Sequence, residues 1–101
     1  MAPFTGKQKR YLRALGQKLT PVVHIGHAGV TDALVAHANA ELDLHELIKV
    51  RVGDNAPEDR HDIAAALADR TRALLAQVIG RTALLYRARA EKPAIVLPEA
   101  P

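Results

Sequence analysis

A Gly-x-x-Gly turn lies between a short β-branched run and a predicted helix start. Gly26 and Gly29 enclose His27 and Ala28, and Thr31 follows as a candidate N-cap. Two glycines three residues apart allow a tight turn with no Cβ to block a close ligand. A helix that starts directly afterwards presents free N–H groups and the positive end of its dipole. The pattern is therefore typical of a phosphate-binding turn, although a plain strand-to-helix turn has the same glycines.

The segment before this turn is basic and contains no acidic residue. Within residues 1–30 the cations are Lys7, Lys9, Arg10, Arg13 and Lys18. The formal charge is +5 for residues 1–30, −2 for 31–52, −2 for 53–78 and +2 for 79–101, so both ends are basic. If the two ends converge in the fold, they form one positive face of the kind that binds nucleic-acid phosphates. The alternative interpretation is that these cations are ordinary solvated charges of helices and of the tail.

Three further cations, Lys49, Arg51 and Arg81, are second-tier candidates for the same surface. Lys49 and Arg51 alternate with apolar residues in a predicted strand and therefore share one of its faces. The solvent-exposed face of a strand often carries such residues without any binding role. Within the turn, a side-chain charge depends on His27, and histidine changes its charge near neutral pH. Most of the electrostatic affinity is therefore expected from residues 7–13.

No motif for catalysis or metal binding appears in the sequence. The chain has no cysteine, and its histidines are His24, His27, His37, His45 and His61. No pair of them has zinc-ligand spacing with a third ligand in reach. We therefore expect no catalytic residue, metal, cofactor or small-molecule substrate. A small enzyme that uses the glycine turn for a phosphoryl ligand is a weaker alternative.

Length and composition predict one globular domain. The chain has 101 residues, of which 49% are hydrophobic, a size that supports a single core. The aromatic residues are Phe4, Tyr11 and Tyr86, too few for the stacking platform of an RRM or an OB fold. No apolar run reaches membrane-spanning length, and Lys7 interrupts any signal-peptide core. We expect a cytoplasmic monomer.

The candidate residues are predicted to lie on an α-β-α-β-α-β-β chain. Thr5 caps a helix over residues 5–19, whose apolar stripe is Leu12, Leu15 and Leu19. A strand over residues 22–25, entered at Pro21, leads to the glycine turn and to a second helix that runs to about His45. Residues 47–52 alternate as a strand, with Ile48, Val50 and Val52 on its covered face.

The second half of the chain predicts a helix and a hairpin. Asn55-Ala56-Pro57-Glu58 resembles a capping box that opens the third helix, with Ile63, Leu67 and Leu74 as its buried stripe. Residues 75–79 and 82–87 are strands joined by Gly80-Arg81 as a two-residue turn. The crossovers imply parallel pairing of the first three strands and an antiparallel last strand, in a mixed four-stranded sheet. The tail from Ala88, with Pro93, Pro98 and Pro101, is expected to be extended and loosely held.

Four separated blocks carry a family resemblance. They are Thr5-Gly6-Lys7-Gln8-Lys9-Arg10-Tyr11-Leu12-Arg13, Pro21-Val22-Val23-His24-Ile25-Gly26, His45-Glu46-Leu47-Ile48-Lys49-Val50 and Gln77-Val78-Ile79-Gly80-Arg81-Thr82. In this order they resemble the CRM RNA-binding domain, and more closely its bacterial stand-alone members of YhbY type. The resemblance implies a fold like the C-terminal domain of translation initiation factor three, RNA binding, and association with precursors of the large ribosomal subunit. It extends from about Thr5 to Leu97. We expect an RNA-binding domain over residues 5–88 and an extended, proline-containing tail over residues 89–101.

Two positions depart from the family pattern. The inner turn residues are His27 and Ala28, where relatives often carry a basic or polar residue, so the turn offers backbone donors and little fixed charge. Thr71-Arg72-Ala73 replaces the usual glycine cap of the third helix. The sequence therefore predicts a non-enzymatic protein that binds rRNA of the large-subunit precursor. The alternative is an interaction module that docks on a ribosomal protein or assembly factor through its acidic middle.

Overall fold

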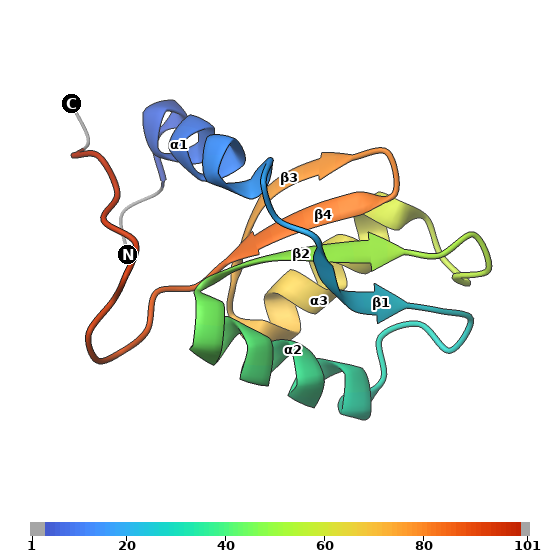
Figure 1. Ribbon diagram of the computed structural model, residues 1–101. Coiled ribbons are helices and arrows are strands. Elements are labelled where there is room, and N and C mark those ends of the chain that lie inside the picture. The colour runs from blue at the N-terminus through green and yellow to red at the C-terminus, as the bar shows by residue number, and fades with distance from the viewer. Residues whose placement is uncertain (1–3, 100–101) are drawn as a thin grey trace.

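The computed structural model describes residues 4–99, which form three helices and a four-stranded sheet in the predicted order (Figure 1). The helices are α1 (Gly6–Gly16), α2 (Asp32–His45) and α3 (Arg60–Thr71). The strands are β1 (Pro21–Ile25), β2 (Leu47–Val52), β3 (Leu74–Ile79) and β4 (Thr82–Tyr86). α1 covers one face of the sheet, whereas α2 and α3 cover the other (Figure 1). The predicted α/β class with a mixed four-stranded sheet is confirmed.

The order of the strands is β1-β2-β4-β3, which corrects the predicted pairing. β1 and β2 pair in parallel, as their crossover helix predicts. β4, however, lies between β2 and β3 and is antiparallel to both. The tight Gly80-Arg81 turn, with a φ of 55° at Gly80, places β4 directly against β3. β1, β2 and β3 therefore run in one direction, but β3 does not pair with β2.

α1 has the predicted start and an earlier end. The Thr5 hydroxyl accepts a hydrogen bond from the Gln8 N–H, and the Gln8 side chain accepts one from the Thr5 N–H, both at 3.1 Å. Leu12 is fully buried, but Leu15 is 37% exposed, so the predicted apolar stripe is wrong at Leu15. α1 ends at Gly16, where a Cβ would lie 2.7 Å from the Leu84 side chain. The end of the helix thus lies directly on the sheet.

The predicted start of α3 is wrong. Asp59 is the N-cap, and its carboxylate accepts a hydrogen bond from the His61 N–H at 3.3 Å. Pro57 does not open the helix but lies against the glycine turn, 3.3 Å from the position of a Cβ on Gly29. This contact explains why the local capping signal at residues 55–58 is not used.

The end of α3 shows how the chain dispenses with a glycine cap. Arg72 adopts the left-handed conformation, with φ 58° and ψ 34°, and its N–H donates to the carbonyls of Ala68 and Asp69. Leu74 consequently lies in β3. The prediction that Leu74 belongs to the buried stripe of the third helix is therefore wrong. No helix in the described part of the chain is long and apolar enough to cross a membrane.

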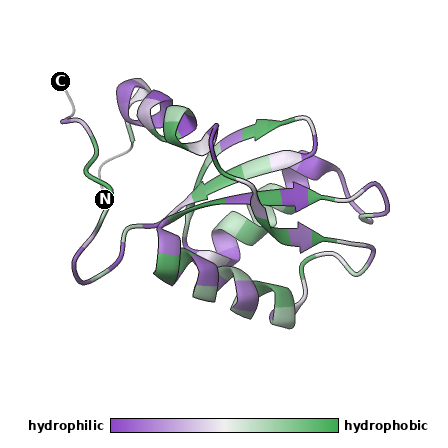
Figure 2. Cartoon of the chain, viewed as in Figure 1, coloured by the Kyte–Doolittle hydropathy of each residue, from purple (hydrophilic) through white to green (hydrophobic). Residues whose placement is uncertain are grey.

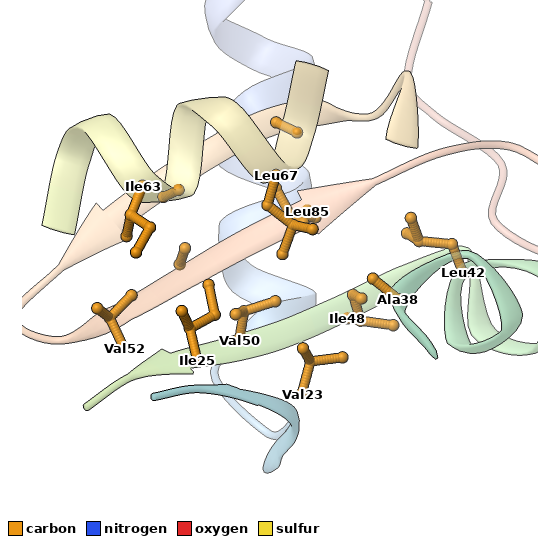
Figure 3. Close-up of a cluster of buried hydrophobic side chains, with 13 residues drawn as sticks. Val23, Ile25, Ala38, Leu42, Ile48, Val50, Val52, Ile63, Leu67 and Leu85 are labelled. Atoms are coloured by element: carbon orange, nitrogen blue, oxygen red, sulfur yellow. The ribbon is translucent and has the colours of Figure 1, made fainter. Parts of the chain in front are cut away.

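Two apolar clusters lie one on each face of the sheet. The larger one lies between the sheet and the helices α2 and α3 (Figure 3). It contains Val23, Ile25, Ala38, Leu42, Ile48, Val50, Val52, Ile63, Ala64, Leu67, Ala68, Ala83 and Leu85. The smaller one, under α1, contains Leu12, Leu47, Ala76, Leu84 and Tyr86. The predicted alternation of β2 is confirmed, since Ile48, Val50 and Val52 all belong to the larger cluster.

A buried carboxylate holds the C-terminal segment, so the prediction of a loosely held tail is wrong. Glu46 directly follows α2, has a φ of 64° and is 0% exposed. Its carboxylate accepts hydrogen bonds from the N–H groups of Arg89, Ala94 and Ile95 at 2.7, 2.7 and 2.8 Å. Burial alone would raise the pKa of Glu46, but these N–H groups and the Arg89 charge hold the pKa below its ordinary value.

The held segment also contacts α1. Ile95 and Leu97 pack against the smaller cluster, and the Pro98 carbonyl accepts a hydrogen bond from the Gln8 side chain at 3.0 Å. Burial, followed by the Glu46 charge, raises the pKa of the Tyr86 hydroxyl in the same cluster. The segment has neither helix nor strand through residue 99, and Pro101 lies outside the described residues. Whether residue 88 bounds an independent domain stays a prediction.

Candidate nucleic-acid interface

The two glycines of the turn have different roles. Gly29 has a φ of 70°, and its N–H donates to the Gly26 carbonyl at 3.0 Å, which closes the turn. Nothing lies within 4 Å of a Cβ position on Gly26. Gly26, His27 and Ala28 are all exposed. The turn therefore presents its backbone openly, as the approach of a phosphate requires.

The N-terminus of α2 is less open to an anion than the sequence predicts. The Thr31 hydroxyl already accepts a hydrogen bond from the Leu34 N–H at 3.1 Å. In the first turn, the Asp32 carboxylate pairs with the Arg70 guanidinium, which also donates to the Val30 carbonyl at 3.3 Å. This pair ties the turn to α3 and places a carboxylate beside the positive end of the dipole. Phosphate binding here would rely on the N–H groups of the turn itself.

Four of the predicted cations lie on α1. Lys7 and Arg10 are exposed, whereas Lys9 and Arg13, one turn apart, are half-buried beside Leu12. Half-buried basic side chains cover apolar surface with their stems and keep their charges in water. α1 contains no acidic residue, and none of these four cations forms an ion pair with residues 4–99. Their charges are available to a ligand.

A second group of cations lies on the same side of the sheet. Lys49 and Arg51 alternate with the core residues of β2 and so point to the α1 side. The strand register places Arg51 beside His24 of β1. Lys18 and Lys49 line one shallow hollow next to the start of β1. These three cations also form no ion pair with the described residues.

Arg81 differs from the other predicted cations because it forms an ion pair and a hydrogen bond within the chain. Its guanidinium pairs with the Asp54 carboxylate at 2.7 Å and donates to the Gly53 carbonyl at 3.3 Å. The pair joins the β3–β4 turn to the loop after β2. Because β1, β2 and β3 run in one direction, the glycine turn emerges at this same end of the sheet (Figure 1). Arg81 thus has a structural contact that the sequence did not predict.

Of the predicted cations, Lys49 and Arg51 of β2 lie nearer to the glycine turn than those of α1. β1 has five residues, so its start, which follows the end of α1 by four intervening residues, lies about 17 Å from the turn. Hydrophilic colour lies on the outer side of α1 and at the turn-side ends of β1 and β2 (Figure 2). Lys49 is level with Pro21 at the start of β1, and Arg51 is level with His24 beside the turn, so the two cations of β2 connect these regions. The predicted residues therefore form an extended surface and not a single pocket.

Three residues on this surface were not predicted from the sequence. Ile79 is 64% exposed, and it lines a hollow at the end of α1 together with Gln77 and Thr82. Only the register of β3 against β4 places them there, and periodicity gives no register. Within residues 4–99, no three His, Cys, Asp or Glu side chains converge on a position that could hold a metal ion.

Comparison with known proteins finds close relatives along nearly the whole chain. Residues 4–87 match the CRS1/YhbY (CRM) domain. A Bacillus subtilis protein named "Probable RNA-binding protein YqeI" is 44% identical over 94 residues, which cover 93% of this chain and 98% of that protein. A Haemophilus influenzae protein named "RNA-binding protein" is 38% identical over 98 residues, or 97% of this chain and 98% of that one.

The fold is also found in a solved structure. The solution structure of a hypothetical protein from Staphylococcus aureus matches with a TM-score of 0.80 and 40% sequence identity. The match covers 95% of this chain and 100% of that chain.

Proposed function

Because the chain belongs to the CRS1/YhbY (CRM) domain family, we propose that it binds structured RNA through the α1 side of its sheet. The names of its Bacillus and Haemophilus relatives support RNA as the ligand. Binding is non-enzymatic and needs no cofactor. The resemblance to YhbY-type proteins further supports rRNA of the large-subunit precursor as the target. In this proposal the protein acts as a monomer in the cytoplasm.

The distribution of ion pairs carries this proposal. On the α1 side, seven cations form no ion pair with residues 4–99: Lys7, Lys9, Arg10, Arg13, Lys18, Lys49 and Arg51. Elsewhere, Arg70, Arg81 and Arg87 each pair with an aspartate. The remaining cations, Arg60, Arg72, Arg89 and Lys92, form no ion pair with residues 4–99 either. The α1 side nevertheless carries seven cations without an ion pair, which suits a polyanion.

The surface suits phosphates more than base edges. The α1 cations precede the start of β1, and that start alone is about 17 Å from the glycine turn, so the two groups would contact phosphates several nucleotides apart. Contacts at this spacing recognise the path of the backbone, the usual mode for structured RNA. The N–H groups of the turn would hold one phosphate, and the α1 cations would hold others further along.

The salt dependence of binding to a 20-base-pair RNA hairpin tests this proposal. If all seven cations contact phosphates, the slope of log Kobs against log salt approaches about −6, at about 0.9 per contact. Changing both Lys9→Glu and Arg13→Glu removes two contacts, so the slope should become shallower by about 2 and affinity at low salt should fall. Circular dichroism checks that the fold is retained.

A matched control makes the same change in net charge on the opposite side of the sheet. Arg60→Glu with Arg72→Glu alters net charge equally, but both residues lie at the ends of α3 on the opposite side. We expect this control to reduce affinity much less than the α1 variant. Equal losses would mean that binding reflects only net charge, and an unchanged affinity in the α1 variant would rule out the proposed site. Crosslinking to RNA in cells would then identify the contacted nucleotides.

The alternative is a protein-docking module that binds a basic partner through the acidic middle of the chain, the third helix in particular. Asp32, Asp43 and Asp54 pair with arginines of their own chain. Asp62 and Asp69 of α3 are exposed and form no ion pair with residues 4–99, so the docking surface would be α3. A pull-down of ribosomal proteins that survives nuclease treatment would favour this alternative.

A further inference from the structure

The α1 side of the sheet is only half covered. α1 ends at Gly16 above Leu84, so the strand positions nearer to the glycine turn stay open. The register aligns four of these positions in one row across the strands, in the order His24, Arg51, Thr82 and Ile79. The row begins two residues before the turn and ends on a largely exposed isoleucine.

A hollow of about 250 Å³ lies between the end of α1 and this row. Its lining includes Gln17, Lys49, Gln77, Ile79, Thr82 and Leu84. Pockets for drug-sized ligands have about 300–1,000 Å³, so this hollow suits a smaller group. It nevertheless exceeds the volume of one water, about 30 Å³, several times over. One planar heterocycle is of the right size.

The chemistry of the lining suits a nucleobase. Ile79, which is 64% exposed, offers apolar surface to a flat face of a ring. The Gln77 amide can both donate and accept at the edge of a base, whereas the Lys49 ammonium can only donate. Arg51, next in the row, is placed to contact the attached phosphate.

Base pairing decides which nucleotides can enter. In a duplex the faces of each base are stacked on their neighbours, so only an unpaired nucleotide can insert its ring into the hollow. We propose that the hollow beside α1 binds the base of one unpaired nucleotide, in an RNA strand that continues to the glycine turn. The inference rests on the proposed RNA-binding function and adds to it a preference for RNA with unpaired nucleotides.

The test compares two RNA probes with the full chain. One probe is a single-stranded uridine dodecamer, and the other is a blunt 12-base-pair RNA duplex, both followed by fluorescence anisotropy. Ile79→Ala should weaken dodecamer binding by about threefold to tenfold, because part of the apolar contact is lost. Duplex binding should change by less than about twofold, since a paired base does not reach the hollow. The control is Leu44→Ala, an equally exposed residue at 65% on the other side of the sheet, which should alter neither.

The outcomes separate this inference from the proposed function. If Gly26→Asp weakens binding of both probes while Ile79→Ala weakens neither, RNA binding stands and the hollow has another occupant, such as a protein side chain. Equal weakening of both probes by Ile79→Ala also overturns the inference. If the wild-type chain binds neither probe, both proposals fall. Dodecamer addition should shift the NMR signals of the Gln77 amide but not those of the Asn39 amide, which accepts a hydrogen bond from Arg87 on the other side of the sheet.

Discussion

Replacing Glu46 by glutamine removes the charge that holds the C-terminal segment. In the wild-type chain one carboxylate oxygen accepts hydrogen bonds from the N–H groups of Ala94 and Ile95, and the other accepts from Arg89. A carboxamide has a single oxygen, and its NH2 group would face an N–H donor in the remaining position. Two hydrogen bonds become neutral, and one buried donor loses its acceptor. Charged hydrogen bonds contribute about 1.5–3 kcal/mol and neutral ones about 0.5–1.5, so we expect a loss of about 3 kcal/mol at neutral pH.

This loss should depend on pH in a defined direction. The pKa of Glu46 in the folded protein lies below its ordinary value of 4.5, so folding favours the ionised form. The stability it contributes is fully present above that ordinary value and disappears as the pH falls through the folded pKa. Once protonated, the glutamate is neutral like glutamine. The difference between wild type and Glu46→Gln should therefore shrink in acid.

Urea unfolding at about pH 7 and about pH 3 measures both quantities, with the m-value as a check on two-state behaviour. Glu91→Gln is the control, because Glu91 is an exposed carboxylate of the same segment. It should change the free energy of unfolding by less than about 0.5 kcal/mol. A loss for Glu46→Gln that is equally large at both pH values, or below about 0.5 kcal/mol at neutral pH, would refute the reasoning.

Two further substitutions test the backbone of the fold. Arg72→Gly should raise the free energy of unfolding by about 1 kcal/mol, because glycine adopts the left-handed cap without strain; a lower urea midpoint would contradict this. Gly16→Ala should cost about 1–3 kcal/mol, because its Cβ would lie 2.7 Å from Leu84. Adding Leu84→Ala should recover part of that cost, and a double variant whose effects simply add would show that the two positions do not interact.

Local signals in the sequence predicted the parts of the fold that local chemistry decides. Thr5 and Thr31 cap their helices as expected, since a hydroxyl at an N-cap needs only its own next turn. β2 alternates as expected because one of its faces meets a continuous core. The hairpin at Gly80 follows from the conformational freedom of glycine.

The errors lie where a distant contact decides the outcome. The local capping signal around Pro57 gives way to packing of Pro57 on Gly29, which is distant in sequence. Leu15 follows the helical period, but α1 meets the sheet through Leu12 and Gly16, which leaves Leu15 at the rim. Periodicity also cannot predict that β4 lies between β2 and β3, because the alternation of residues in a strand does not identify the strands beside it.

The candidate site divides in the same way. The cations of α1 and the glycine turn could be named from the sequence, because charge and turn chemistry are local. The ion pairs of the site residues could not be predicted from the sequence. Arg81, for example, pairs with Asp54, which lies in a different loop. The hollow around Ile79 depends on the register of three strands and on where α1 ends.

The clamp at Glu46 also sets an order in which the chain can mature. Its three hydrogen-bond donors lie in residues 89–95, more than forty residues further along the chain. While the protein is being synthesised, α2 and β2 emerge long before these donors exist. Until then the carboxylate must stay solvated or protonated, because burying it without partners is costly. The junction of α2 with β2 therefore closes only after residues 89–95 have been synthesised, so a segment that follows the last strand completes the folding of the first half of the sheet.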